Sequence, residues 1–120
     1  MKIKVKLSIV NEKDDPFMGI GIVWLLQRIK SFGSINKAAE DMHMSYVKAH
    51  RILNKCEEEL GEKLLIKSIG GNKRGGARLT DFAEYFIEKY CVLQESVKEF
   101  AEREFGRFYT DIDELMKKDF

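Results

Sequence analysis

The chain has 120 residues, of which 44% are hydrophobic and 34% are charged. This length suits one domain with one modest core, and the composition is typical of a folded protein in water. No apolar run reaches the ~20 residues that cross a bilayer, and Lys alternates with apolar residues where a signal peptide needs a continuous apolar stretch. We therefore expect a cytoplasmic protein that has no membrane partner.

The formal net charge of +1 is unevenly distributed along the chain. Residues 1–80 hold 15 Lys and Arg against 9 Asp and Glu, whereas residues 81–120 hold 6 against 11. A basic body followed by an acidic segment hints at nucleic acid at one end of the chain. Alone this is weak evidence, because charged faces are usually just solvated.

The first third of the chain predicts a strand, a turn and a helix. Apolar and polar residues alternate over residues 2–10, which is the period of a half-buried strand. Residues 11–16 form a polar turn that contains the only proline. From Phe17 to Phe32 the apolar residues recur at helical spacing, and Gly33 follows in the position where helices commonly end.

Two serines predict the starts of two more helices, because serine is a favoured N-cap residue. The helix after Ser34 contains Ala38 and Ala39, whose small side chains let a second helix cross it closely, as in a helix-turn-helix. His43 lies in the turn, where a left-handed backbone is common and His tolerates it better than most residues. The helix after Ser45 has a single apolar stripe, made of Ala49, Ile52, Leu53, Cys56 and Leu60, and Gly61 ends it.

The opposite face of this second helix carries basic and amide side chains, and acids appear only at its far end. A donor-rich surface of this kind is what the major groove of DNA accepts. A solvated amphipathic helix is the plainer interpretation of the face alone, but the Ala-Ala helix and the turn favour DNA. We assign Arg51 and Asn54 to base edges, and Lys48 and Lys55 to phosphates. The candidate DNA-binding residues in this region are Ser34, Ser45, Tyr46, Val47, Lys48, His50, Arg51, Asn54 and Lys55.

A glycine-rich hairpin follows. LLIKSI (64–69) and ARLT (77–80) predict two strands, and GGNKRGGA (70–77) joins them with four glycines. Glycines let the backbone approach a phosphate, and cations supply the charge, so we predict a DNA-binding wing. A flexible surface loop is the alternative, whereas a nucleotide phosphate loop is excluded because G-x-x-x-x-G-K-[ST] is missing. The candidate DNA contacts in the wing are Asn72, Lys73, Arg74 and Arg78, with Lys73 and Arg74 on phosphate.

The last segment predicts a helix that needs a partner surface. Thr80 is a suitable N-cap. A seam with spacings of 4, 3, 4 and 3 residues follows, as in a coiled coil, and its residues are Phe86, Tyr90, Leu93, Val97 and Phe100. We expect a second copy of the chain to cover this seam, giving a homodimer. Gly106 and the cap-like Thr110 predict a break before a short terminal helix.

These residues resemble a known family. GSINKAAEDMHMSYVKAHRILNKCEEELGEKLL followed by GGNKRGGARLT is similar to the winged helix-turn-helix of LysR-type regulators, and more closely to the N-terminal domain of the molybdate-responsive ModE repressors. The resemblance implies a dimeric DNA-binding transcription regulator, with a recognition helix from Ser45, a wing at 70–76 and a dimer contact from Thr80. ModE repressors also carry a C-terminal oxyanion-binding region, and the sequence stops at Phe120, so we expect no molybdate binding.

The sequence does not favour an enzyme. No Ser/His/Asp or Cys/His set stands at informative spacing, so we expect neither catalysis nor a cofactor. Cys56 and Cys91 form no C-x-x-C motif and no metal-ligand spacing with His43 or His50, so we expect reduced thiols and no metal. Cys56 lies on an apolar stripe and is expected in the core.

The predicted fold is mainly α with a small β wing. A winged helix-turn-helix domain occupies residues 1–80, and a C-terminal helical dimerisation segment occupies residues 81–120. Two alternatives to a specific regulator remain open: a winged-helix protein-interaction module and a nonspecific DNA-architectural protein. Concentrated cations on both the recognition helix and the wing argue against the first, and steep salt dependence with little sequence preference would indicate the second.

Overall fold

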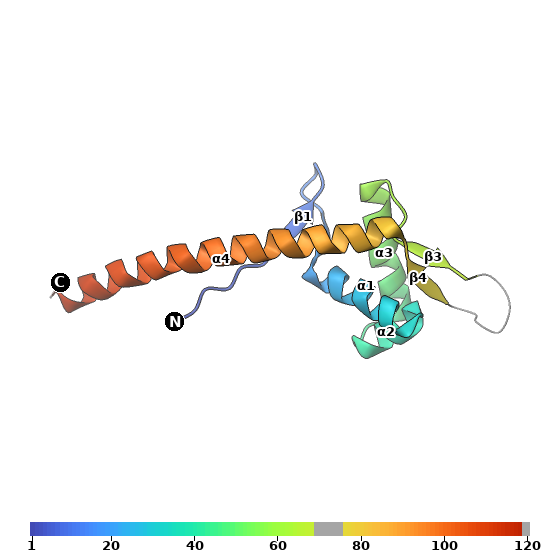
Figure 1. The fold of residues 1–120 in the computed structure, drawn as a ribbon, viewed down its shortest axis with the longest axis horizontal. Coiled ribbons are helices and arrows are strands. Elements are labelled where there is room, and N and C mark those ends of the chain that lie inside the picture. Colours follow the sequence, from blue (N-terminus) through green and yellow to red (C-terminus); the bar gives the residue numbers. More distant parts are fainter. Residues whose placement is uncertain (69–75, 119–120) are drawn as a thin grey trace. The chain divides into compact units, whose positions relative to one another are not determined.

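The protein is described from a computed structural model that covers residues 1–68 and 76–118 (Figure 1). The described part of the chain is mainly helical with a small β wing, as predicted, and it also contains a second small antiparallel hairpin near its start that was not predicted. Its elements, in order, are β1 (Ser8–Val10), β2 (Pro16–Gly19), α1 (Ile20–Phe32), α2 (Ile35–Asp41), α3 (Tyr46–Leu60), β3 (Leu65–Lys67), β4 (Ala77–Leu79) and α4 (Asp81–Lys117). β1 pairs with β2, and β3 pairs with β4. Among the helices described, none is long and apolar enough to span a bilayer.

The chain forms two compact units. One consists of Leu7–Glu88 and contains both hairpins, the first three helices and the start of α4. The other combines Met1–Lys6 with Lys89–Phe120 and contains most of α4. Each unit is considered by itself below.

The beginning of the chain differs from the sequence prediction in two places. The strand covers only Ser8–Val10 instead of residues 2–10, and Pro16–Gly19 forms the second strand of a hairpin where the start of a helix was predicted. Met18 pairs with Ile9 in this hairpin and is only 2% exposed. Pairing with a neighbouring strand and burial of Met18 therefore override the helical spacing of residues 17–19, and α1 begins at Ile20.

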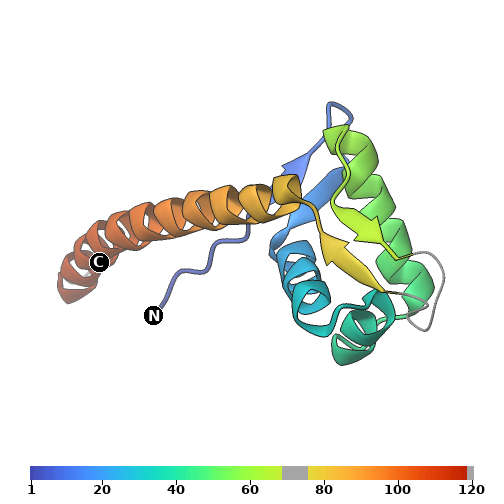
Figure 2. The same ribbon diagram turned by 45° about the vertical axis from the view of Figure 1, so that its right-hand side comes forward.

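The first three helices of Leu7–Glu88 pack against one another (Figure 2). The side chains that they bury are mainly small and aliphatic. Ala38 and Ala49 are both 0% exposed, so α2 and α3 approach closely, as the sequence predicted. His43 has φ of 57°, which confirms the left-handed backbone predicted for the turn between them. Gly33 and Gly61 end α1 and α3 at φ of 69° each, a conformation that costs glycine little.

Helix α4 runs unbroken from Asp81 to Lys117, so the predicted break near Gly106 is wrong. The Thr80 hydroxyl caps its start by accepting a hydrogen bond from Ala83 N at 3.0 Å. The Thr110 hydroxyl does not cap a new helix but donates to Gly106 O, one turn earlier, at 3.0 Å. A single glycine costs a helix only about 1 kcal/mol relative to alanine, which is too little to end it.

Candidate nucleic-acid interface

The outward face of α3 is open to solvent and lacks acids in its first turns. The inward stripe is buried at Ala49, Leu53 and Cys56, which are 0–2% exposed, so the predicted apolar face is confirmed. The exposed residues on the other side are Tyr46, Val47, Lys48, Arg51, Asn54 and Lys55. These six sequence candidates are therefore all accessible to solvent. The basic and amide side chains among them carry hydrogen-bond donors of the kind that a major groove accepts.

The two candidate serines are N-caps. Ser34 Oγ accepts a hydrogen bond from Lys37 N at 3.2 Å, and Ser45 Oγ accepts one from Lys48 N at 3.1 Å. Both hydroxyls keep a proton that they can donate, because capping uses only an acceptor lone pair. Each serine thus stands at a helix N-terminus, where backbone N–H groups and the helix dipole favour an anion.

The described part of the second hairpin contains one of the predicted wing contacts, Arg78. Ile66 pairs with Arg78, and Lys67 pairs with Ala77. Arg78 is exposed, as its proposed contact with DNA requires. The other wing candidates, Asn72, Lys73 and Arg74, lie outside the described residues.

The base of this hairpin is fixed beside the start of α2. Ala77 N donates to Gly33 O at 2.9 Å, and an antiparallel bridge joins Ser34 to Gly76. The strand that enters α4 therefore adjoins the same loop that caps α2. This arrangement places exposed Arg78 and the N-cap Ser34 in one region of the domain.

His50 lies at the edge of the exposed face of α3. Its ring contacts the Tyr46 ring in a tilted arrangement, and the two ring centroids are 4.2 Å apart. Its Nε2 atom is buried and has no hydrogen-bond partner within the described ranges. Burial lowers the pKa of His50 below its usual 6.5, and the positive charge of Lys67 lowers it further.

Lys67 was missed in the sequence analysis. The positive charge of this lysine of β3 contributes to the lowered pKa of His50. Side chains of a strand alternate between faces, so Lys67 shares a face with Leu65, which is 8% exposed and belongs to the core. The alternation in LLIKSI was the signal that could have placed Lys67 on the same face of the strand as Leu65.

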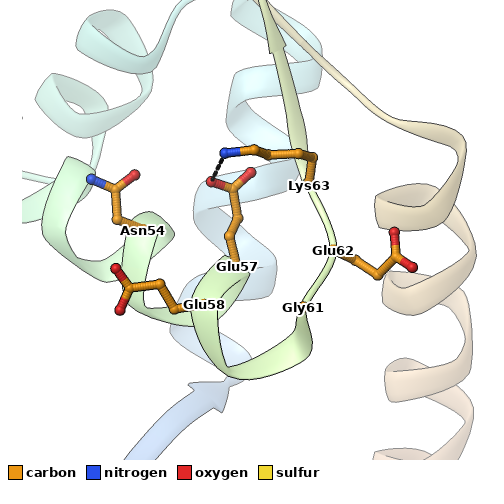
Figure 3. Close-up of a pocket in the computed structure, with 6 residues that line it drawn as sticks. All are labelled: Asn54, Glu57, Glu58, Gly61, Glu62 and Lys63. Carbon is orange, nitrogen blue, oxygen red and sulfur yellow. Dashed lines mark ion pairs between the residues drawn. The ribbon is translucent and has the colours of Figure 1, made fainter.

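The far end of α3 is acidic and has a structural role. Glu57 Oε2 accepts hydrogen bonds from Leu64 N at 2.7 Å and Leu65 N at 3.4 Å, and Glu57 Oε1 lies 3.9 Å from Lys63 Nζ (Figure 3). This carboxylate ties the start of β3 to α3. A shallow pocket beside it is lined by Asn54, Glu57, Glu58, Gly61, Glu62 and Lys63. Its carboxylates would repel phosphate, so the candidate interface reaches this pocket only at Asn54 and does not extend to its acidic side.

The structure offers no support for a metal centre here. Within the described ranges, His, Cys, Asp and Glu form no group of three or more that could hold a metal ion. Cys56 is fully buried, as predicted, and its Sγ lies 3.8 Å from Met18 Sδ. Burial raises the pKa of the Cys56 thiol to about 11, and the neighbouring Glu57 adds to this effect.

The sequence profile of the bacterial regulatory helix-turn-helix proteins of the lysR family matches residues 25–84, which is half of the chain and includes α2, α3 and both wing strands. The chain belongs to the lysR family of regulatory helix-turn-helix proteins. The resemblance inferred from the residues is thereby confirmed.

Named relatives confirm the similarity to ModE. The chain is 35% identical over 74 residues to the transcriptional regulator ModE of Haemophilus influenzae and 33% identical over 70 residues to the molybdenum transport protein ModE of Azotobacter vinelandii. These alignments cover 62% and 58% of this chain, but only 29% and 26% of the relatives. The chain therefore corresponds to less than a third of the curated relatives it matches.

Solved structures of this lysR-type fold agree. The structure of the CbnR_DBD-DNA complex superposes with a TM-score of 0.58 at 22% identity, covering 75% of this chain and 98% of that one. The structure of the BenM_DBD/benA site 1 DNA complex superposes with a TM-score of 0.53 at 21% identity, covering 77% of this chain and 97% of that one. At such identities the comparison establishes the winged helix-turn-helix fold.

Proposed function

We propose that this chain is a sequence-specific DNA-binding transcriptional regulator that acts as a homodimer in the cytoplasm. The observation that carries the proposal is the exposed, donor-rich and acid-free outer face of the first half of α3, in a chain of the lysR family. A relative from Escherichia coli strain K12, 35% identical over 72 residues, is a DNA-binding transcriptional dual regulator, ModE. Two proteins of the same fold have been solved as DNA complexes.

The exposed side chains of α3 divide into two roles. Arg51 is proposed to read guanine and Asn54 adenine, because each can form paired hydrogen bonds with the major-groove edge of that base. Lys48 and Lys55 flank them and are proposed to bind phosphate, which fixes the register of the helix but carries no sequence information. The remaining proposed contacts are Ser34, Ser45, Tyr46, Val47 and His50, together with Asn72, Lys73, Arg74 and Arg78 of the wing.

The proposed homodimer rests on the seam of α4. Leu93 is 48% exposed and Phe100 is 57% exposed, so these two side chains of the seam face solvent in the single chain, whereas Tyr90 is 3% exposed and belongs to the core. A second copy can cover them by coiled-coil packing. In this arrangement residues 1–80 bind DNA and residues 81–120 form the dimer, which places two recognition helices in successive major grooves of a two-fold site.

The decisive experiment is selection of bound sequences from a random DNA pool. The affinity for the enriched sequence is then measured as a function of salt concentration. An enriched two-fold motif with a large preference over random DNA supports the specific regulator. Binding without enrichment would indicate a DNA-architectural protein instead. Failure to bind DNA at low salt would exclude both DNA-binding hypotheses and favour the winged-helix protein-interaction module.

Two α3 variants test the proposed reading face within that experiment. Arg51→Ala is expected to cost on the order of 1–3 kcal/mol of DNA-binding free energy, and to relax the base preference at one position of the site. Lys55→Ala is the matched control, because losing a phosphate contact weakens all sequences about equally and lowers the salt dependence by about one counterion. An unchanged base preference in Arg51→Ala would show that another residue reads the site.

A further inference from the structure

A groove lies beside α3, between segments that are far apart in the sequence. It has a volume of about 320 Å³ and is lined by residues of the first hairpin, the first half of α1, the turn before α3 and the first half of α3. All these residues belong to the unit Leu7–Glu88, so the groove is formed within that unit. Its volume is near the lower end of the range of about 300–1,000 Å³ in which proteins hold small ligands. The size therefore suits a small molecule better than a peptide or a protein.

The lining of the groove is mostly apolar. Two of its side chains, Met18 and Leu25, are 2% and 1% exposed, and the other large apolar ones are only partly buried in the single chain. Half of these side chains are methionines, which are unbranched and polarisable and so adapt to ligands of different shapes. The groove can therefore hold the apolar body of a ligand. Its six large apolar residues are Met18, Ile22, Leu25, Met42, Met44 and Ile52.

Lys48 is the only charged residue among those that line the groove. It is exposed in the first turn of α3, and none of the ion pairs in the described part of the chain includes it. An ammonium group beside an apolar groove favours a ligand that carries a negative charge, whereas a cationic ligand would be repelled. The positive end of the helix dipole adds to this preference, because Lys48 is close to the start of α3.

We propose that this groove binds a small amphipathic carboxylate, with the apolar body of the ligand against Met18, Met42 and Met44 and its carboxylate on Lys48 Nζ. The apolar lining accounts for the body of the ligand, and the single cation accounts for its charged end. A purely apolar ligand would leave the ammonium group unused, and a small inorganic anion would leave the apolar surface uncovered.

The proposed ligand would also act on DNA binding, because Lys48 is a proposed phosphate contact. A carboxylate on Lys48 competes with the DNA backbone for the same ammonium group. The ligand therefore weakens DNA binding, and DNA weakens binding of the ligand by the same factor. This coupling rests on the proposed function, whereas the ligand site itself does not.

The first test measures binding of decanoate to the full chain by isothermal titration calorimetry, without DNA and below the concentration at which decanoate forms micelles. Decanoate should bind, and decylammonium should bind at least about fivefold more weakly, because it places a second cation beside Lys48. Equal affinities for the two would overturn the inference, since apolar area alone would then explain binding. Absence of decanoate binding would overturn it as well.

Two lysines of α3 form a matched pair for the charged end of the site. Lys48→Gln should weaken decanoate binding about two- to fivefold, which is the loss expected for an exposed ion pair. Lys55 is also exposed on α3 but does not line the groove, so Lys55→Gln should keep the wild-type affinity. Equal affinities of the two variants would show that the carboxylate is not on Lys48.

Two helical glycines form a matched pair for the apolar part of the site. A Cβ added at Gly21, which lines the groove, or at Gly106 of α4, which does not, would meet nothing within 4 Å beyond its own helical turn. Leucine favours a helix over glycine at either position, so both variants should fold. Gly21→Leu should weaken decanoate binding at least about tenfold by occupying part of the groove, and Gly106→Leu should leave it unchanged. The opposite ranking would overturn the inference.

The methionines locate the ligand in wild-type protein. With labelled methionine methyl groups, NMR signals of Met18, Met42 and Met44 should shift as decanoate is added, and that of Met116, which is 71% exposed on α4, should not. A shift at Met116 alone would place the ligand on the exposed face of α4 and overturn the inference. Shifts at the groove that follow protein concentration, and not decanoate, would assign the groove to a second copy of the chain.

The last test adds DNA. Saturating decanoate should lower the affinity for the enriched duplex by about the factor that Lys48→Gln lowers it, and should have no further effect on that variant. Unchanged DNA affinity in saturated wild-type protein would overturn the coupling. Failure of ligand-free protein to bind any duplex would instead refute the proposed function, and the calorimetry would still decide the ligand site.

Discussion

Two leucines, one in each compact unit, differ widely in how far their side chains are exposed to solvent. Leu53, in the unit Leu7–Glu88, is 2% exposed, whereas Leu93, in the second unit, is 48% exposed. Both stand on regular helical stripes. The helical period therefore identifies which face is apolar, but only the surrounding fold decides whether that face is covered within the chain. The first unit buries the apolar stripe of α3 at Leu53, whereas the stripe of α4 is half exposed at Leu93 in the second.

The largest expected contrast is in the free energy of unfolding. Leu53→Ala removes a core side chain and should destabilise the protein by about 2–5 kcal/mol. Leu93→Ala should cost less than about 1 kcal/mol at concentrations that keep the chain monomeric, because that side chain is already half exposed. Denaturant unfolding of both variants measures the difference, and similar losses would contradict the distinction between the units.

The two cysteines, one in each unit, are expected to differ in chemical reactivity as the two leucines differ in exposure. The pKa of Cys56 rises from 9.0 to about 11 because the thiol is buried, so its thiolate is about a hundredfold scarcer near neutral pH. Cys91 is partly exposed on α4. Alkylation followed by mass spectrometry should therefore modify Cys91 well before Cys56. Modification of Cys56 first would mean that the core opens more readily than its burial implies.

A charge introduced into the seam tests the proposed partner surface directly. Phe100→Glu should weaken dimerisation at least about tenfold, since it places a charge in an apolar contact. Val92→Glu is the control, because Val92 is 58% exposed but lies outside the seam. Sedimentation equilibrium measures both variants. Equal effects would place the dimer contact elsewhere on the chain.

Two hydroxyl side chains give the smallest expected contrast. Ser45→Ala removes the N-cap of α3 and should cost about 1 kcal/mol of stability. Thr110→Ala removes only a bond to a carbonyl within α4 and should change stability by less than about 0.5 kcal/mol. Thermal unfolding of each variant against wild type measures these losses. A larger loss in Thr110→Ala would show that the bond to Gly106 supports the distal helix.

Signals confined to a few neighbouring residues were sufficient to predict much of the fold. Ser34, Ser45 and Thr80 cap helices as predicted, and His43 adopts the left-handed backbone expected for the turn. Capping and turn preferences act over three or four residues, so they are visible in the sequence. The outward positions of Arg51 and its neighbours follow from the same helical geometry.

The missed features depend on contacts between distant segments. Residues 16–19 form β2 because they pair with β1, and neither strand specifies that pairing by its own spacing. Glu57 was seen only as an acid at the end of a helix, but the returning chain places two backbone N–H groups of β3 against it. Lys67 became a candidate only once the register of the hairpin set its face.

The anchored base of the second hairpin has a consequence for how such proteins diversify. Ser68 N donates to Gly76 O at 2.8 Å, and Ala77 N donates to Gly33 O at 2.9 Å. These bonds close the hairpin from within the domain, so the intervening segment can change in length or sequence without rebuilding the core. Grafting this segment from one family member to another should therefore preserve the fold, so the proposed contribution of the wing to target choice can be tested separately from that of the recognition helix.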